Sequence, residues 1–156
     1  MEIKYYVAIF LILVFILCPQ TGYEVDGPLL NHVTWIFCHA NLFHLFGNIV
    51  CLLMLKRKLF LVPAFVISVV ASFIPILIIG GTYATMGFSG VLFAIIGIKY
   101  GDYGKWKLCA KNCLPWIAIS IFFPHMNWCI HLYCLTIGYL YGAIRRRYIK
   151  RTRSRE

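Results

Sequence analysis

The stretch MGFSGVLFAIIGIKY (residues 86–100) joins a serine flanked by glycines to a continuous apolar segment. On a helix of about 3.6 residues per turn, one face of this segment carries only small side chains, at Gly90, Ala94 and Gly97. A second apolar segment further along the chain has a similar narrow face, at His131, Cys134 and Gly138. Because small faces let helix backbones approach closely, we expect these two helices to pack together, with Ser89 and His131 at the same end.

The composition predicts that the packing takes place in a membrane. The 156 residues are 62% hydrophobic and 13% charged, with a mean hydropathy of +0.82. Soluble domains are roughly 45–50% apolar and about 25% charged. We therefore expect one integral membrane domain over residues 1–144, followed by a basic cytoplasmic tail over residues 145–156.

Apolar segments recur along the whole chain, and we compare them with the roughly 20 residues that a helix needs to cross the hydrocarbon core. Six transmembrane spans with a cytoplasmic N-terminus place all fifteen Lys and Arg residues on the cytoplasmic side. Five spans would leave the arginine-rich tail outside. The predicted fold is an all-α bundle of six transmembrane helices with both termini cytoplasmic. The expected location is a bacterial cell membrane, with a multi-pass arrangement and spans at 5–18, 37–55, 59–80, 87–100, 113–124 and 127–144.

The net charge of +10 arises largely from the tail that begins Arg145-Arg146-Arg147. Directly after an apolar segment, such a tail is typical of an anchor at anionic lipid headgroups, so we favour the lipid bilayer over nucleic acid as its partner. The seven cysteines lie mostly in or next to apolar segments and form no Cys-x-x-Cys pair. The sequence therefore predicts no disulfide framework, no metal site and no cofactor.

Polar side chains interrupt the second apolar segment. His44 and Asn48 are one turn apart and share a helix face, while His39 lies toward the outer end. Polar groups at membrane depth mark either a functional site or a hydrogen-bonded link between helices. His32 and His125 are expected in outer loops, with surface or loop hydrogen bonds.

The combination of Ser89 and His131 indicates nucleophilic catalysis, because a serine hydroxyl reacts only when an adjacent base takes its proton. The negative charge that develops on the attacked carbonyl needs aimed donors, which His44 and Asn48 are placed to supply. No acidic residue falls within a predicted span. A pair of serine and histidine is therefore expected in place of a triad.

These motifs, His39-x4-His44-x3-Asn48, Gly87-x-Ser89-Gly90 and His131 followed by Gly138, resemble those of the rhomboid intramembrane serine proteases in order and spacing. The resemblance covers roughly residues 35–142. It implies hydrolysis of peptide bonds in or beside the transmembrane helices of membrane protein substrates. It also implies a role for each matching residue: Ser89 as nucleophile, His131 as general base, His44, Asn48 and the Ser89 N–H as oxyanion donors, and His39, Gly87, Gly90, Phe93 and Gly138 in support.

The chain departs from the rhomboid pattern at three positions. Cys134 replaces a common glycine, Ile130 a common alanine, and Phe93 the tyrosine on which the catalytic histidine packs in many members. Two other functions stay open on sequence grounds. One is a catalytically silent protein of the same fold that binds transmembrane clients, and the other is a small transporter or a haem or metal protein with His44 and His131 as ligands.

Overall fold

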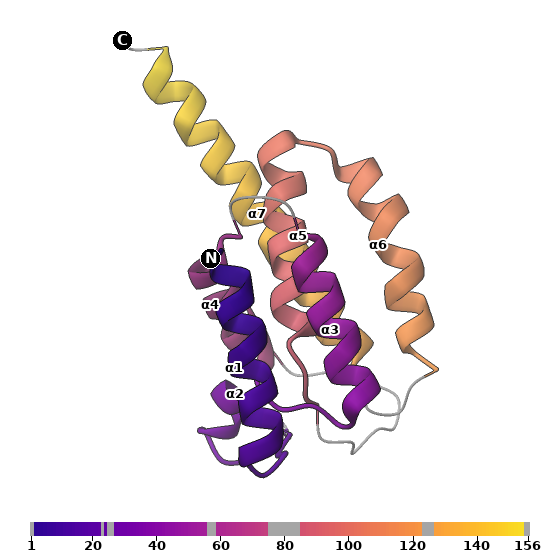
Figure 1. Cartoon of the computed structure of the whole chain (residues 1–156). Coiled ribbons are helices and arrows are strands. Elements are labelled where there is room, and N and C mark those ends of the chain that lie inside the picture. Colours follow the sequence, from indigo (N-terminus) through magenta and orange to yellow (C-terminus); the bar gives the residue numbers. More distant parts are fainter. Residues whose placement is uncertain are drawn as a thin grey trace.

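The computed structural model describes residues 2–22, 24, 27–55, 59–74, 85–122 and 127–154. Within these ranges the chain forms seven α-helices (Figure 1). Their bounds are α1 (Ile3–Leu17), α2 (Asn31–Thr34), α3 (Leu42–Met54), α4 (Leu61–Ser72), α5 (Ser89–Tyr103), α6 (Trp106–Ser120) and α7 (Trp128–Arg153). Each of the six predicted apolar segments overlaps one helix, although α6 begins seven residues before its predicted segment and α7 ends nine residues after its own, and the short α2 is additional.

The prediction of a six-span membrane bundle is wrong, because none of the helices in the described ranges combines the length and apolar character needed to cross a membrane. The helices α1, α3, α4, α5 and α6 have 12 to 15 residues, against the roughly 20 required. Only α7 is longer, with 26 residues, and arginines begin at Arg145 in its second half. The finding also contradicts the multi-pass arrangement and the location in a bacterial cell membrane.

The error arose from counting apolar residues as helical ones. The apolar run at 37–55 begins before α3, which starts at Leu42, and the run at 59–80 begins before α4, which starts at Leu61. Residues 75–80 and 123–124 of the predicted spans lie outside the described residues, as do His125 and the basic residues at 56–58.

The centre of the fold is the parallel pair of α5 and α7, which pack backbone against backbone through glycines. A Cβ at Gly97 would overlap the backbone of Leu135 and Tyr139, and one at Gly138 would overlap Ala94. The same contact continues further along, where Gly142 lies against Ile98. The predicted packing of two small faces is therefore confirmed, and it fixes how far α7 is shifted along α5.

The other helices cover this pair. Helix α4 packs against both α5 and α7, α6 contacts both as well, α3 contacts α5, and α1 lies along α3. Figure 1 shows α1 and α4 on one side of the central pair and α6 on the other. Fully buried side chains fill the space between them, including Trp35, Leu52, Ile95, Ile98 and Leu135.

An ion pair closes the end of the central pair that is distant from Ser89. Arg145 donates to both carboxylate oxygens of Asp102, at 3.2 and 2.9 Å, and its guanidinium lies 4.7 Å from the centre of the Phe60 ring. Beyond this contact α7 continues without a break into the basic tail as far as Arg153. In Figure 1 this last part of α7 extends past all the other helices.

Candidate active site

Ser89 and His131 meet at the start of the two central helices. Ser89 is the first residue of α5 and His131 lies in the first turn of α7. The Ser89 Oγ and the His131 Nε2 are 2.8 Å apart. The hydroxyl is half-buried and the imidazole is 5% exposed. This is the distance at which an imidazole can remove a hydroxyl proton.

The position of Ser89 at the start of a helix keeps its hydroxyl away from the backbone. Ser68, Ser72 and Ser120 lie within or at the end of helices, and each donates to a carbonyl three or four residues earlier, at 2.6 to 2.9 Å. Such back-bonding is the usual state of a serine in a helix. Ser89 has no preceding helical turn, and its hydroxyl contacts His131.

The His131 ring is held by packing. It stacks on Phe93, with 4.6 Å between ring centroids and an interplanar angle of 28°. The buried Nδ1 of His131 has no hydrogen-bond partner among the described residues, so no carboxylate among them orients the ring. The site therefore consists of a serine and a histidine, with Phe93 keeping the aromatic surface on which the imidazole rests.

Burial determines the charge of His131. Desolvation, together with the nearby His44, lowers its pKa from 6.5 to about 3. The imidazole is therefore neutral at physiological pH. A neutral imidazole can accept a proton from Ser89, whereas a protonated one cannot.

His44 and Asn48 project from α3 toward the backbone just before Ser89. Asn41 caps this helix by accepting a hydrogen bond from the His44 N–H at 2.9 Å, which fixes where the helix begins. A Cβ at Gly87 would lie 2.6 Å from the His44 Nε2 and 3.7 Å from the Asn48 Nδ2. The Asn48 amide also donates to the His44 carbonyl at 3.0 Å. The two predicted oxyanion residues are thus buried next to residue 87.

Gly87 is required by its backbone as well as by its neighbours. Its φ is +123°, a value that residues with a side chain rarely adopt, and the ring of His44 occupies the place of a Cβ. After this turn the chain enters α5 at Ser89. The first N–H groups of a helix have no carbonyl partner within it, and they carry the positive end of the helix dipole. The Ser89 N–H therefore lies where an oxyanion can be stabilised.

His39 is fully buried, and its ring contacts that of His44. Their ring centroids are 5.3 Å apart, and the His39 backbone N–H donates to the Gln20 Oε1 at 2.8 Å. Desolvation, reinforced by His44, lowers the pKa of His39 to about 4. The structure thus places His39 behind His44, the predicted oxyanion donor.

The bulky replacements at Cys134 and Ile130 fit beside Gly90. A Cβ at Gly90 would be 3.4 Å from atoms of both side chains and 2.9 Å from the Trp35 ring. The Cys134 thiol is buried, donates to the Ser68 Oγ at 3.7 Å, and has its pKa raised to about 12 by burial. Cys134 is consequently an inert packing residue at this interface.

Sequence reasoning missed the contact between the segment that precedes α5 and the segment that precedes α7. Asn127 caps α7 by accepting from the N–H groups of Cys129 and Ile130, at 3.1 and 3.3 Å. Its amide also donates to the Thr85 Oγ1 at 2.9 Å. An asparagine just before an apolar segment is a signal for a helix start, but the partner at residue 85 has no local signal.

His32 is not on the surface, and that prediction is wrong. The side chain is 2% exposed, its Nδ1 lies 3.0 Å from the Ser72 Oγ, and its ring stacks on Phe73 at 4.2 Å. Residue 125, the other histidine predicted in a loop, lies outside the described residues.

Two further observations bear on the class of protein. In the described part of the chain, no group of three or more His, Cys, Asp or Glu side chains is arranged to hold a metal ion. Comparison of the chain with protein-family models, with curated proteins and with solved structures gives no match. The function is therefore inferred from the geometry of the site.

Proposed function

We propose that the protein is a serine endopeptidase that hydrolyses peptide bonds in or next to the transmembrane segments of membrane proteins. The observation that carries the proposal is the 2.8 Å contact between the Ser89 Oγ and the His131 Nε2, at a buried and neutral imidazole. The resemblance of the motif residues to those of rhomboid proteases supports the same reaction class. The resemblance concerns those residues alone, since no helix in the described ranges is long and apolar enough to cross a membrane.

The reaction follows the usual course of acyl transfer. Ser89 Oγ attacks the peptide carbonyl while His131 Nε2 takes its proton, and His131 then gives that proton to the leaving amine. The acyl group stays on Ser89 until water, deprotonated by His131, attacks the ester carbonyl and releases the new carboxylate. The neutral state of His131 suits the first of these steps.

The donors around Gly87 stabilise the tetrahedral intermediates. The side chains of His44 and Asn48 lie next to Gly87, two residues before the nucleophile, and the Ser89 N–H is at the start of α5. Donors that are already in place need no reorganisation as charge develops, and each typically contributes roughly 10²–10³ in rate.

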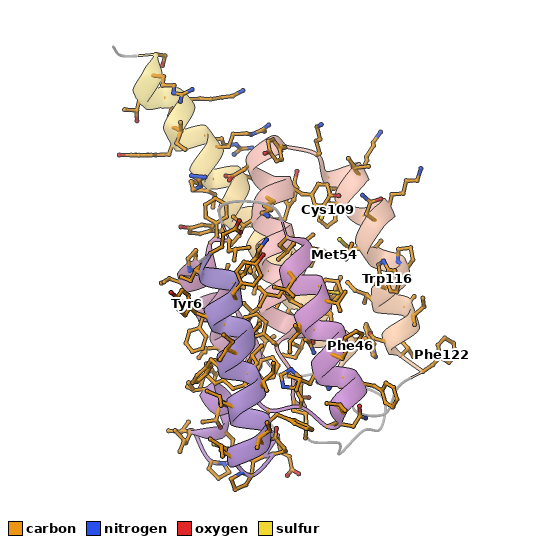
Figure 2. All side chains as sticks on the ribbon, viewed as in Figure 1. Tyr6, Phe46, Met54, Cys109, Trp116 and Phe122 are labelled. Carbon is orange, nitrogen blue, oxygen red and sulfur yellow. The ribbon has the colours of Figure 1, made fainter. Side chains whose placement is uncertain are left out.

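The surfaces flanking the site favour apolar substrates. On α3, Phe43 is 88% exposed and Phe46 65%, and after the end of α6 Phe122 is 83% exposed. Figure 2 shows Trp116 and Phe122 pointing outward from α6 and the turn that follows it. Large exposed apolar surfaces mark interaction sites, and an apolar transmembrane segment is a matching partner.

The basic end of the molecule suits a second partner, the anionic headgroups of the membrane that holds the substrate. The exposed cations at this end come from α6 and the end of α7: Lys105, Lys107, Lys111, Arg147, Lys150, Arg151 and Arg153. Nitrogen-tipped side chains gather there in Figure 2. Cationic clusters gain about 1 kcal/mol per residue near an anionic surface. Stronger binding to vesicles containing phosphatidylglycerol than to pure phosphatidylcholine is expected.

The test is cleavage of a model protein with one transmembrane segment, incorporated with the purified protein into lipid vesicles. Cleavage is expected for the wild type and is expected to be lost in Ser89→Ala and His131→Ala. Ser120→Ala is the matched control, because among the described residues that hydroxyl bonds back to the Ile117 carbonyl of its own helix. Cleavage that persists in Ser89→Ala would overturn the mechanism. Retention of the substrate without cleavage by the wild type would favour the silent client binder.

A further inference from the structure

We propose that Trp35 is a positioning residue for the nucleophile, an inference that rests on the proposed function. Trp35 directly follows α2 and is 1% exposed. It contacts the chain on both sides of Ser89. Its carbonyl accepts a hydrogen bond from the Gly87 N–H at 2.9 Å, and its ring lies against Gly90, where a Cβ would be 2.9 Å from the Trp35 Cη2.

The tryptophan is itself held from behind. Its Nε1–H donates to the His32 carbonyl at 3.0 Å. The His32 ring is fixed in turn by the Ser72 Oγ at 3.0 Å and by stacking on Phe73. A continuous series of contacts therefore runs from the end of α4, through α2, to the turn that carries the nucleophile.

These contacts restrict the two degrees of freedom that would displace the hydroxyl. The hydrogen bond from the Gly87 N–H to the Trp35 carbonyl fixes the turn before Ser89. Gly87 has a φ of +123°, and a glycine has few steric restraints of its own that would hold this angle. The ring against Gly90 limits rotation of the first turn of α5. Ser89 lies between these two points, and its hydroxyl is directed at His131, 2.8 Å away.

The inference predicts a loss of turnover per active site. Fluorophosphonate labelling counts molecules with a reactive Ser89, and kcat is expressed per labelled site. Trp35→Phe should lower kcat about tenfold and Trp35→Ala about 100-fold, with KM changed less than about threefold, because displacements near 1 Å cost up to roughly 10² in rate. Trp106→Ala, at a tryptophan that begins α6 and is 42% exposed, is the control and should leave kcat unchanged.

A double-mutant cycle tests the ring contact separately. Gly90→Ala places a methyl group against the Trp35 Cη2 and should lower kcat. Phenylalanine does not reach as far as the tryptophan Cη2, so Gly90→Ala should have a smaller effect in the Trp35→Phe background. If the two substitutions acted independently, their fold-reductions in kcat would multiply. The kcat of the double variant should exceed that expected value by at least about threefold, because residues in contact do not act additively.

The outcomes separate this inference from the proposed function. If Ser89→Ala were labelled and cleaved substrate as well as the wild type does, the proposed function would be overturned, and the role of Trp35 with it. Dependence on Ser89, together with an unchanged kcat per labelled site in both Trp35 variants, would overturn the positioning role alone. The positioning role would also be overturned if the fold-reductions in kcat of Trp35→Phe and Gly90→Ala simply multiplied in the double variant. A reduced number of labelled sites at normal kcat would show that Trp35 serves stability only.

Discussion

The described residues contain two contacts between a serine hydroxyl and an imidazole, and only one has the environment of a catalytic pair. Ser72 and His32 are 3.0 Å apart, close to the 2.8 Å between Ser89 and His131. The Ser72 hydroxyl, however, lies 2.6 Å from the Val69 carbonyl, to which it donates. Its proton is engaged with the backbone at the end of α4 and is not available to the imidazole. Proximity alone does not make a nucleophile.

The position of each serine in its helix explains the difference. Ser72 ends a helix and has carbonyls one turn earlier, whereas Ser89 begins one and has helix N–H groups around it. The first arrangement supplies acceptors that bind the hydroxyl proton. The second supplies donors that can stabilise an oxyanion. The same pair of residues thus connects α2 to α4 at one place and forms a candidate active site at the other.

The sharpest way to break this comparison is to remove each hydroxyl in turn. Ser89→Ala should lower kcat about 10⁴-fold or more, as expected for loss of a nucleophile. Ser72→Ala should lower it less than about tenfold and should mainly reduce the free energy of unfolding, by about 1 kcal/mol for a lost buried hydrogen bond. Cleavage rates and denaturant unfolding of both variants measure this. Equal losses of kcat would show that the two pairs are not functionally distinct.

The second largest effect should come from the donors that only the Ser89 pair possesses. Asn48→Ala and His44→Ala should each lower kcat by roughly 10²–10³ with little change in KM, because the oxyanion exists only in the transition state and intermediates. Asn112→Ala is the matched control, since that exposed amide donates to the Tyr100 hydroxyl far from the site. An unchanged kcat in Asn48→Ala would remove Asn48 from the oxyanion site.

A third effect concerns pH. An unfolded histidine has a pKa near 6.5, whereas folded His131 and His39 have values of about 3 and about 4. Below pH 6.5 the unfolded chain therefore binds more protons, and stability falls as the pH drops toward 4 and then 3. At pH 5, about 1.5 units below the pKa of the unfolded histidine, each of the two residues lowers the free energy of unfolding by about 2 kcal/mol.

Urea unfolding of the wild type and of His39→Asn at pH 7 and pH 5 measures this loss. The variant lacks the imidazole of His39, so its free energy of unfolding should fall about 2 kcal/mol less between the two pH values. A loss of the same size in both proteins would show that His39 is not buried as a neutral group.

The smallest effect should come from Asn127, which lies next to the Ser89 pair and has no counterpart at Ser72. Asn127→Ala removes the cap of α7 and should lower the free energy of unfolding by about 1 kcal/mol. Asn127→Asp keeps the oxygen that accepts from Cys129 and Ile130 and loses only the donor to Thr85. Thermal unfolding of the two variants separates the cap from the link. Equal destabilisation would assign the whole effect to the Thr85 contact.

The sequence was informative where local spacing decides the outcome. Helical periodicity predicted the packing of the small faces at Gly97 and Gly138, since side chains three and four residues apart share a face. Glycines flank Ser89 in the sequence, and the first of them, Gly87, has the positive φ that a residue with a side chain rarely adopts. The stacking of His131 on Phe93 agrees with what the resemblance to rhomboid proteases implied for that position.

The errors have physical causes that spacing does not reveal. The length of an apolar run does not set the length of a helix, because residues 37–41 are apolar in part and yet precede α3. His32 was assigned to a loop, but its partner Ser72 lies 40 residues away and buries it. The contacts from Trp35 to Gly87 and from Asn127 to Thr85 are likewise long-range, and they become visible only when the helices are in place.

The glycine contacts between α5 and α7 have a consequence for alignment. Ser89 faces His131, Ala94 faces Gly138 and Asp102 faces Arg145, so the numbering offset between the two parallel helices stays at 42 to 44 along their shared length. A slip of one residue would move the imidazole about 1.5 Å along the axis and turn it by about 100°, which breaks its contact with the hydroxyl. The glycine contacts therefore allow only one register between α5 and α7. That register places the Ser89 hydroxyl beside the His131 imidazole, although the glycines lie up to several turns away.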